Sequence, residues 1–424
     1  MPPSAQPPPQ PQLPQPQAST PPPAGSRRRR AAVLAVGVVA VAVIVVGIVV
    51  ALRADPDGGT AARRTSAGTA PRTTVGTMVP TASPSRVPAG LPARAGVTVG
   101  SALYQRSPAS LARALDDVVD LHLGWIRIDL SWAEIQPDSA ARFRWEDVDT
   151  VVAAARRRGL QVLGLLTYTP AWARADGCRG FVCPPRSTAE FARFAAAAVA
   201  RYAPRGVRTY QLWNEPNIAQ FWADPDPVAY GRLVTATVPA MRAAAPGLTV
   251  VLGGLAFAGT DDDARDRGDV DAGRFLARAC ADRRCPVDAI GYDPDTYPAL
   301  PSATTQPPNA WQLMTRPASG RVALRTAMAR VGLGRTPVWV TGFGAPTRYA
   351  GARSRRVVAE STQARILLDG ARLAGRRDSG VAAYFVDTLR DTARHGSLRD
   401  HFGLVTADGR RKPAFRTLAR AFGG

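Results

Sequence analysis

The sequence predicts an α/β fold, a (β/α)8 barrel over residues 95–424, preceded by a single transmembrane helix and by disordered N-terminal segments. Three observations support this prediction. Short apolar runs alternate eight times with longer amphipathic segments after residue 95. No glycine-rich phosphate loop follows these runs, which disfavours a doubly wound open sheet. A continuous apolar stretch also stands apart from the alternation, near the N-terminus.

The first 94 residues divide into three segments of different composition. Residues 1–30 are rich in Pro and Gln and end in four arginines, so we expect a disordered cytoplasmic tail. Residues 31–52 contain only Ala, Val, Ile, Leu and Gly and would span about 33 Å as one helix, enough to cross a bilayer. Residues 53–94 have the composition of a flexible stalk. The arginines predict a cytoplasmic N-terminus, a single-pass anchor in the cell membrane and an extracytoplasmic barrel.

Eight β-strands are expected, each a short run rich in Val, Ile and Leu. They occupy residues 97–99, 125–130, 160–166, 207–212, 249–252, 287–292, 338–341 and 381–385. An amphipathic helix is expected after each strand, at residues 108–123, 145–158, 187–202, 227–245, 273–282, 322–331, 361–374 and 412–422. This repeated order predicts a parallel sheet covered by helices, and eight such units are typical of a closed barrel.

Four cysteines occur as two close pairs, Cys178 with Cys183 and Cys280 with Cys285. Their spacing matches neither a zinc-binding nor a redox motif, and the three histidines are scattered, so we expect no metal and no cofactor. Two local disulfides in an oxidising compartment are favoured, which agrees with an extracytoplasmic barrel. Four buried free thiols are the alternative, and four cysteines permit three pairings.

The net charge of +21 favours anionic surroundings such as a membrane face, acidic polysaccharide or nucleic acid. No nucleic-acid-binding module is recognisable, and an extracytoplasmic barrel would not meet DNA. One alternative function is therefore an interaction protein, whose basic barrel surface docks on anionic wall polymer. The other candidate functions use the interior of the barrel.

Residues at the carboxyl ends of the expected strands are the candidates for chemistry, because barrels carry their active sites there. Glu215 ends the fourth strand and is the candidate proton donor, while Asp293 and Asp295 follow the sixth strand. The candidate sugar-binding residues combine aromatic faces with polar groups: Arg127, Trp132, Trp172, Trp213, Asn214, Tyr292 and Phe343. A polysaccharide or oligosaccharide is the ligand that this set favours.

Each candidate also has a structural alternative. The Asn-Glu-Pro sequence at 214–216 is a common helix start, and Arg127 could belong to a buried ion pair. The rings of Trp132 and Trp172 could pack loops. The two aspartates at 293 and 295 could be turn residues around the proline between them.

The region 95–422 resembles the clan A barrel glycosidases, close to the family 39 and family 5 glycoside hydrolases. The matching stretches are 125–137 (WIRIDLSWAEIQP), 210–217 (YQLWNEPN), 287–298, 337–347 (PVWVTGFGAPT) and 402–415 (FGLVTADGRRKPAF). The resemblance implies a retaining mechanism, with an acid/base glutamate after strand four and a nucleophilic glutamate after strand seven. It assigns the acid/base role to Glu215, a contact with the sugar 2-hydroxyl to Asn214 and the floor of the site to Arg127.

The chain departs from the family pattern where the nucleophile is expected. The strand-seven sequence TEFG is replaced by TGFG at 341–344, so Gly342 stands at the nucleophile position. On strand six, His-Pro-Tyr is replaced by DPD at 293–295. We therefore expect one of two outcomes: inverting hydrolysis with Glu215 as acid and an aspartate of strand six as base, or a groove that binds glycan without cleaving it.

Overall fold

The computed structural model describes residues 87–424, apart from 259–267, 282–284, 350–351, 353 and 355. The expected cytoplasmic tail, the expected membrane helix at 31–52 and most of the expected stalk lie outside the described residues. Within the described part of the chain, none of the helices combines the length and the apolar character needed to cross a bilayer.

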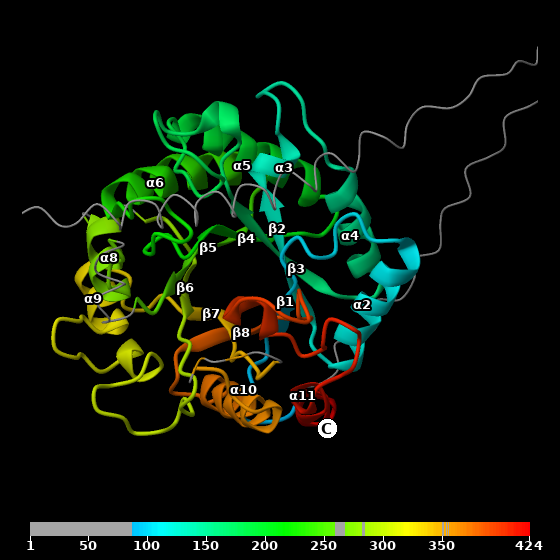
Figure 1. The fold of residues 1–424 in the computed structure, drawn as a ribbon. Helices are drawn as coiled ribbons and strands as arrows, with labels where there is room; N and C mark the ends of the chain where they lie inside the picture. Colours follow the sequence, from blue (N-terminus) through cyan, green and yellow to red (C-terminus); the bar gives the residue numbers. More distant parts are fainter. Residues whose placement is uncertain (1–86, 259–267, 282–284, 350–351, 353, 355) are drawn as a thin grey trace, which may run out of the picture. The chain divides into compact units, whose positions relative to one another are not determined.

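Eight parallel strands form a closed barrel, in which each strand pairs with its sequence neighbours (Figure 1). The strands are β1 (Ala95–Thr98), β2 (Trp125–Ser131), β3 (Gln161–Thr167), β4 (Thr209–Asn214), β5 (Thr249–Ala256), β6 (Ala289–Asp293), β7 (Val338–Phe343) and β8 (Val381–Asp387). The barrel closes where β1 pairs with β8, with Val97 opposite Val386. The predicted barrel and its eight strands are confirmed.

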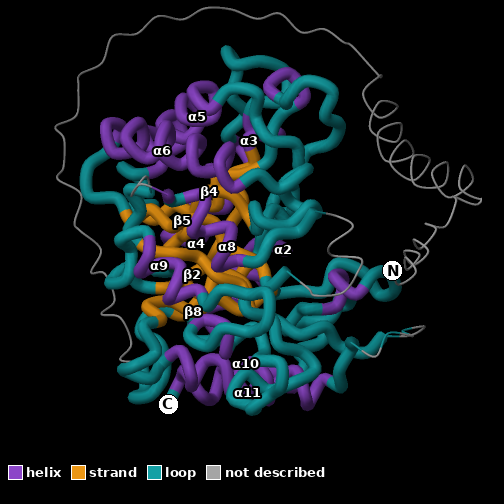
Figure 2. The backbone as a smooth tube through the Cα atoms, turned by 90° about the vertical axis from the view of Figure 1, so that its left-hand side faces the viewer, coloured by secondary structure: helices purple, strands orange, loops and turns teal. Residues whose placement is uncertain are grey.

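Helices surround the strands, which run through the middle of this domain (Figure 2). The helix after each strand is α2 (Pro108–Asp120), α4 (Glu146–Arg157), α5 (Thr188–Tyr202), α6 (Pro227–Ala244), α8 (Ala272–Ala279), α9 (Leu324–Arg330), α10 (Glu360–Ala374) and α11 (Pro413–Gly423). Shorter turns are α3 (Trp132–Ile135), η1 (Ala171–Ala173), η3 (Gln312–Met314) and η4 (Leu398–His401). Polar caps fix several helix starts. At α6, for example, the Asp226 carboxylate accepts hydrogen bonds from the first free backbone N–H groups.

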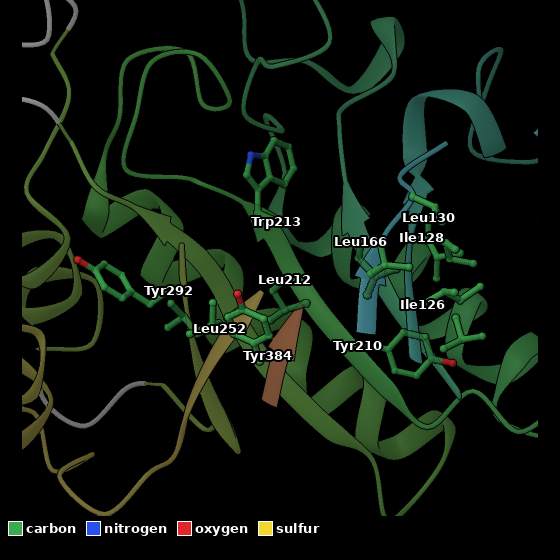
Figure 3. Close-up of a cluster of buried hydrophobic side chains, with 14 of the residues drawn as sticks. Ile126, Ile128, Leu130, Leu166, Tyr210, Leu212, Trp213, Leu252, Tyr292 and Tyr384 are labelled. Atoms are coloured by element: carbon green, nitrogen blue, oxygen red, sulfur yellow. The ribbon is translucent and has the colours of Figure 1, made fainter. Parts of the chain in front are cut away.

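Side chains of the strands alternate between the outside and the inside of the barrel, because successive residues of a strand point to opposite faces. In β2, Ile126, Ile128 and Leu130 belong to the core between strands and helices (Figure 3). The residues between them, Arg127 and Asp129, line the interior instead. The alternation therefore directs polar residues of an apolar strand into the barrel.

An aromatic layer fills part of the barrel interior. Trp125 makes edge contacts with Trp339 and with Phe385, at ring-centroid distances of 6.1 and 6.4 Å. These residues belong to a cluster separate from the outer core. Trp125 begins β2 and the polar residues of that strand follow it, so this layer lies toward the amino-terminal end. At the carboxyl ends of the strands, the barrel interior has room for polar side chains instead.

Two irregularities interrupt the alternation near the carboxyl ends of the strands. The pairing of β5 with β6 shifts between Leu252 and Leu255, and that of β7 with β8 shifts between Val340 and Phe343. Bulges of this kind redirect side chains at barrel rims. Since β6 lies between β5 and β7, Asp293 at its end lies between the two bulges.

Both expected disulfides are present. Cys178 is bonded to Cys183 in the loop between β3 and α5, and Cys280 is bonded to Cys285 just after α8. Their Cα atoms are 5.9 and 5.1 Å apart, within the usual range for a disulfide. The prediction of two local disulfides is confirmed, and the alternative of free thiols is wrong.

Candidate active site

A cavity of about 820 Å³ opens at the carboxyl ends of the strands. Every strand contributes to its wall, through Thr98, Arg127, Asp129, Leu165, Asn214, Ala256, Asp293, Gly342 and Asp387. Glu215, directly after β4, and Asp295, two residues after the end of β6, also line it. The structure thus brings together the predicted polar residues and the predicted carboxylates around one space, at the end where barrels of this kind carry their chemistry.

A hydrogen-bond network forms the floor of the cavity. The guanidinium of Arg127, only 5% exposed, donates from Nε to Gln211 Oε1 and from Nη2 to Asn214 Oδ1, both at 2.7 Å. The side-chain amide of Gln211 donates in turn to Thr341 Oγ1 at 3.4 Å. Arg127 is therefore held by amide oxygens, and the expected alternative, a buried ion pair, is not what fixes its position. A fixed guanidinium in turn fixes the amide of Asn214 at the edge of the cavity.

Glu215 leaves β4 with its backbone in the left-handed region, at φ +41°, and Trp213 two residues earlier has φ +68°. Such conformations are rare outside glycine and cluster at functional sites. The Glu215 N–H donates to Gly254 O at 2.9 Å, which ties this turn to β5. Burial, and next the nearby negative charge of Asp293, raise the pKa of the Glu215 carboxyl well above its usual value. The proton of this carboxyl is therefore held more tightly than that of a free glutamic acid.

The Asp293 carboxylate is bound to the end of β7. Its Oδ1 accepts hydrogen bonds from Thr341 Oγ1 at 2.7 Å, from Gly342 N at 2.7 Å and from Thr341 N at 3.2 Å. Burial raises the pKa of Asp293 to about 6, while the charge of Arg127 opposes that rise. All three donors reach Oδ1, and the Asp293 side chain lines the cavity.

Glycine at two bulge positions makes room for this carboxylate. A Cβ on Gly254 would come within 2.4 Å of Asp293 Oδ2, a distance at which the two atoms would clash. A Cβ on Gly342 would lie 3.3 Å from the same oxygen, a tight contact. Asp293 therefore occupies the space beside the end of β7, next to the position where a strand-seven side chain would emerge.

Three further carboxyls surround this pair. Asp295 accepts a hydrogen bond from Gly344 N at 3.0 Å, and Asp129 and Asp387 line the cavity from β2 and β8. Burial raises the pKa of Asp129 to about 6 and also raises the pKa values of Asp295 and Asp387. The cavity thus gathers several carboxyls whose pKa values are raised by burial.

Five predicted sugar-binding residues do not line the cavity, which corrects the sequence interpretation of their position: Trp132, Trp172, Trp213, Tyr292 and Phe343. Trp132 is fully buried, stacks on Phe194 and meets Trp172 edge to face, and Trp213 packs on Trp222. The side chain of Tyr292 turns outward and donates to Ala310 O at 2.8 Å.

The physical reason for this difference is the alternation of side chains along each strand. Tyr292 precedes Asp293 by one residue and therefore faces the helices. Phe343 would face inward if the alternation were regular, but the bulge in β7 directs it into the outer core, against Trp311 and Tyr384. We do not carry these five residues into the proposed site.

Several wall residues come from loops that sequence reasoning did not single out. They are aromatic or basic: Phe221, Phe257, Tyr297, Arg356, Arg399 and Phe402. Gln211 was missed as well, although it lies three residues before Asn214 on the same strand. The loop residues carry no local signal because they follow different strands and meet only in the folded chain.

A contact between Arg399 and the loop after β4 crosses the mouth of the barrel. Arg399 in η4, which follows β8, donates a hydrogen bond to Gln220 Oε1. Its guanidinium also lies 5.4 Å from the ring centre of Phe221. In a ring of eight strands β4 and β8 are opposite one another, so this contact spans the cavity. The charge of Arg399 also lowers the pKa of Glu215 against the larger effect of burial.

Among the described residues, no group of three or more His, Cys, Asp and Glu side chains is arranged to hold a metal ion. The carboxyls of the cavity are instead held by backbone N–H groups and hydroxyls, as at Asp293 and Asp295.

Comparisons with known proteins identify the fold. No protein-family model matches the chain. A family 39 glycoside hydrolase from Bacteroides cellulosilyticus WH2 superposes with a TM-score of 0.57 and 19% identity, over 78% of this chain and 64% of that one. The chain has the fold of the clan A glycoside hydrolases. A GH5_18 protein from Streptomyces cattleya also superposes, with a TM-score of 0.52 and 21% identity over 77% of this chain and 79% of that one.

Sequence similarity covers a smaller part of the barrel. A β-xylosidase from Geobacillus stearothermophilus is 34% identical over 118 residues, which are 26% of this chain and 21% of that enzyme. The match thus spans about a fifth of the curated relative. The resemblance to family 39 and family 5 glycoside hydrolases is confirmed as a shared barrel fold, and the catalytic roles of individual residues remain predictions.

Proposed function

We propose that this protein is a glycoside hydrolase-like enzyme that cleaves O-glycosidic bonds of a polysaccharide or oligosaccharide, with Glu215 as general acid and Asp293 as its partner carboxylate. The observation that carries the proposal is the pairing of these two groups at one cavity. Burial and the charge of Asp293 favour the protonated form of Glu215, while hydrogen bonds from Thr341 and Gly342 favour the charged form of Asp293 against the larger effect of its burial. Acid and base roles require two carboxyls whose surroundings separate their pKa values.

An inverting reaction fits these residues best. Asp293 Oδ2 would take a proton from a water molecule as that water attacks the anomeric carbon. Glu215 would give its proton to the departing glycosidic oxygen, so that bond breaks as the new carbon–oxygen bond forms. Gly342 supplies no nucleophile, and its lack of a side chain leaves space beside Asp293. Asp295, held by Gly344 N, is the second candidate for the base.

Arg127 and Asn214 would bind the sugar that undergoes reaction. Arg127 is fixed by two hydrogen bonds of 2.7 Å, so little entropy is lost when Asn214 contacts a sugar hydroxyl. Tyr297 and Phe402 meet edge to face in the cavity wall, with ring centroids 5.5 Å apart, and offer ring surface for the apolar face of a sugar.

The test is release of reducing sugar by the full-length protein from a panel of polysaccharides and aryl glycosides. Glu215→Gln and Asp293→Asn remove one ionisable group each and keep the shape. Glu146→Gln in the exposed first turn of α4 and the exposed Asp116→Asn are matched controls. We expect activity in the parent and in both controls, with a loss of at least about 100-fold in each cavity variant. Full activity in Glu215→Gln would refute the assignment.

Glycan binding without cleavage is the second candidate, and the absence of a carboxylate at Gly342 favours it. The same panel separates the two functions. A parent that binds an oligosaccharide in calorimetry but releases no sugar, with binding lost in Arg127→Ala, would identify the cavity as a binding site only.

The position of the barrel outside the cell membrane also belongs to this proposal. Residues 31–52 would be the anchor, and the disulfides Cys178–Cys183 and Cys280–Cys285 support an oxidising compartment for the barrel. Protease added to intact cells should digest the barrel and leave the N-terminal tail protected. Release of the protein from membranes by alkaline carbonate would contradict the anchor.

A further inference from the structure

Phe181 is an exposed aromatic residue beside the cavity. Among the described residues, three large apolar side chains are more than a third exposed, and Phe181, at 56%, is exposed furthest. The other two, Val119 at 42% and Val228 at 37%, lie on the outer helices α2 and α6. Phe181 instead lies in the loop after β3, at the end of the barrel where the cavity opens.

The backbone around Phe181 is fixed from several directions. The disulfide between Cys178 and Cys183 closes a short loop around it. The carbonyl of Phe181 accepts a hydrogen bond from Thr169 N at 3.1 Å, and the carbonyl of Cys183 accepts one from Thr169 Oγ1 at 2.7 Å. The carbonyl of residue 182 accepts another at 3.0 Å, from Ala223 in the loop after β4. The ring is therefore presented from a rigid loop.

An aromatic contact connects Phe181 to the cavity. Its ring meets the ring of Tyr168 edge to face, with centroids 5.1 Å apart and planes at 89°. Tyr168 lines the cavity and has its backbone in the left-handed region, at φ +60°. Phe221, in the loop that is bonded to residue 182, lines the same cavity. Aromatic surface thus continues from the inside of the cavity to the solvent.

We propose that Phe181 and Tyr168 form an outer sugar-binding subsite, which holds a further pyranose unit of a chain whose reacting unit lies at Glu215. This proposal rests on the proposed function. The C–H face of a pyranose is apolar and stacks on an aromatic ring, and a rigid loop lowers the entropic cost of that contact. The subsite makes the protein selective for chains of two or more units over single sugars.

The competing explanation is that Phe181 packs the loop. A ring with more than half of its surface in solvent adds little to packing, whereas Phe191, in the helix after the same loop, is fully buried. The loop also has a disulfide and several backbone hydrogen bonds to hold it. The exposed ring is therefore explained better by a ligand than by the stability of the loop.

The experiment compares the full-length parent with Phe181→Ala and Phe181→Trp on aryl β-glycosides of xylose, glucose and mannose and on their oligomers of two to six units. Phe181→Ala should lower kcat/KM, or the affinity in calorimetry, by about 3- to 10-fold for oligomers and leave the single-sugar glycosides unchanged. Phe181→Trp should restore oligomer selectivity. Val228→Ala on α6 is the control for loss of an exposed apolar side chain.

Any other result would contradict the proposed subsite. Equal losses on single sugars and on oligomers would mean that Phe181 acts through the shape of the cavity. No change on any compound would mean that the ring contacts no sugar, while Glu215→Gln would still report whether the proposed function holds. A parent that neither binds nor cleaves any member of the panel would refute the proposed function and the subsite together.

Discussion

The backbone N–H of Gly342 donates a hydrogen bond of 2.7 Å to Asp293 Oδ1, so a carboxylate from β6 is fastened to the end of β7. The other oxygen of that carboxylate lies 3.3 Å from the place where a Cβ on Gly342 would be. The two positions are therefore coupled: the side chain at 342 decides how much room Asp293 has.

This coupling predicts that Gly342→Glu alone lowers activity, by about tenfold or more, because two adjacent carboxylates repel and raise each other's pKa. Removing Asp293 should relieve the repulsion, so Gly342→Glu/Asp293→Ala should be more active than Asp293→Ala. Initial rates on the best aryl glycoside of the panel test this, and NMR of the first-formed sugar gives the anomer. A single Gly342→Glu variant faster than the parent would contradict the coupling. Gly342→Ala is the control, because it replaces the glycine without adding a carboxylate.

The pH profile of kcat/KM should be bell-shaped. Activity should rise as Asp293 loses its proton, with a midpoint near pH 6, because the base must be ionised. It should fall at higher pH as Glu215, whose pKa is raised by burial and by Asp293, loses the proton that it must donate. In Asp293→Asn, the pH profile of the remaining activity should lack the acidic limb. A profile that is flat between pH 4 and 9 would exclude this pair as acid and base.

Arg399 should control both the alkaline limb of the pH profile and the access of substrate to the cavity. Its positive charge lowers the pKa of Glu215, so Arg399→Ala should move the alkaline limb toward higher pH. Gln220→Ala removes the hydrogen bond across the mouth but keeps the charge, and should leave that limb in place. Both variants should improve cleavage of long chains relative to short ones if the contact restricts the mouth. Identical pH profiles for Arg399→Ala and the parent would refute the electrostatic role.

The ion pair between Lys412 and Asp391 should be important for stability. The two groups are 2.8 Å apart with side chains 1% and 6% exposed, and the ammonium also donates to Thr347 Oγ1. Lys412→Met would leave Asp391 buried without a counter-charge and should lower the free energy of unfolding by about 3–5 kcal/mol. The double variant Lys412→Met/Asp391→Leu should recover much of that loss. Denaturant unfolding measures both.

A matched surface pair gives the control for this prediction. Arg144 and Asp138 are 2.6 Å apart, but each side chain is about half exposed, at 52% and 55%. Arg144→Ala should therefore cost no more than about 1 kcal/mol. Equal losses in Lys412→Met and Arg144→Ala would show that burial of the first pair does not matter.

The sequence by itself predicted the barrel and its eight strands, and it favoured two local disulfides. Strand and helix periodicities are local signals that repeat eight times here. Cysteines five residues apart favour local pairs, but the structure was needed to choose among the three pairings and free thiols. It also placed Glu215 and Asp293 at the mouth, because each ends a strand and parallel strands in a barrel end at the same face.

The tertiary structure alone decided which residues face the cavity. Alternation gives the face of a side chain only where the register is regular, and the bulge in β7 directs Phe343 outward beside Gly342. The tertiary structure also decided which residues distant in sequence contact one another. Arg399 and Gln220, for example, are 179 residues apart and meet only because β4 and β8 are opposite in the closed ring. Periodicity contains no information about such contacts, because they depend on closure of the barrel.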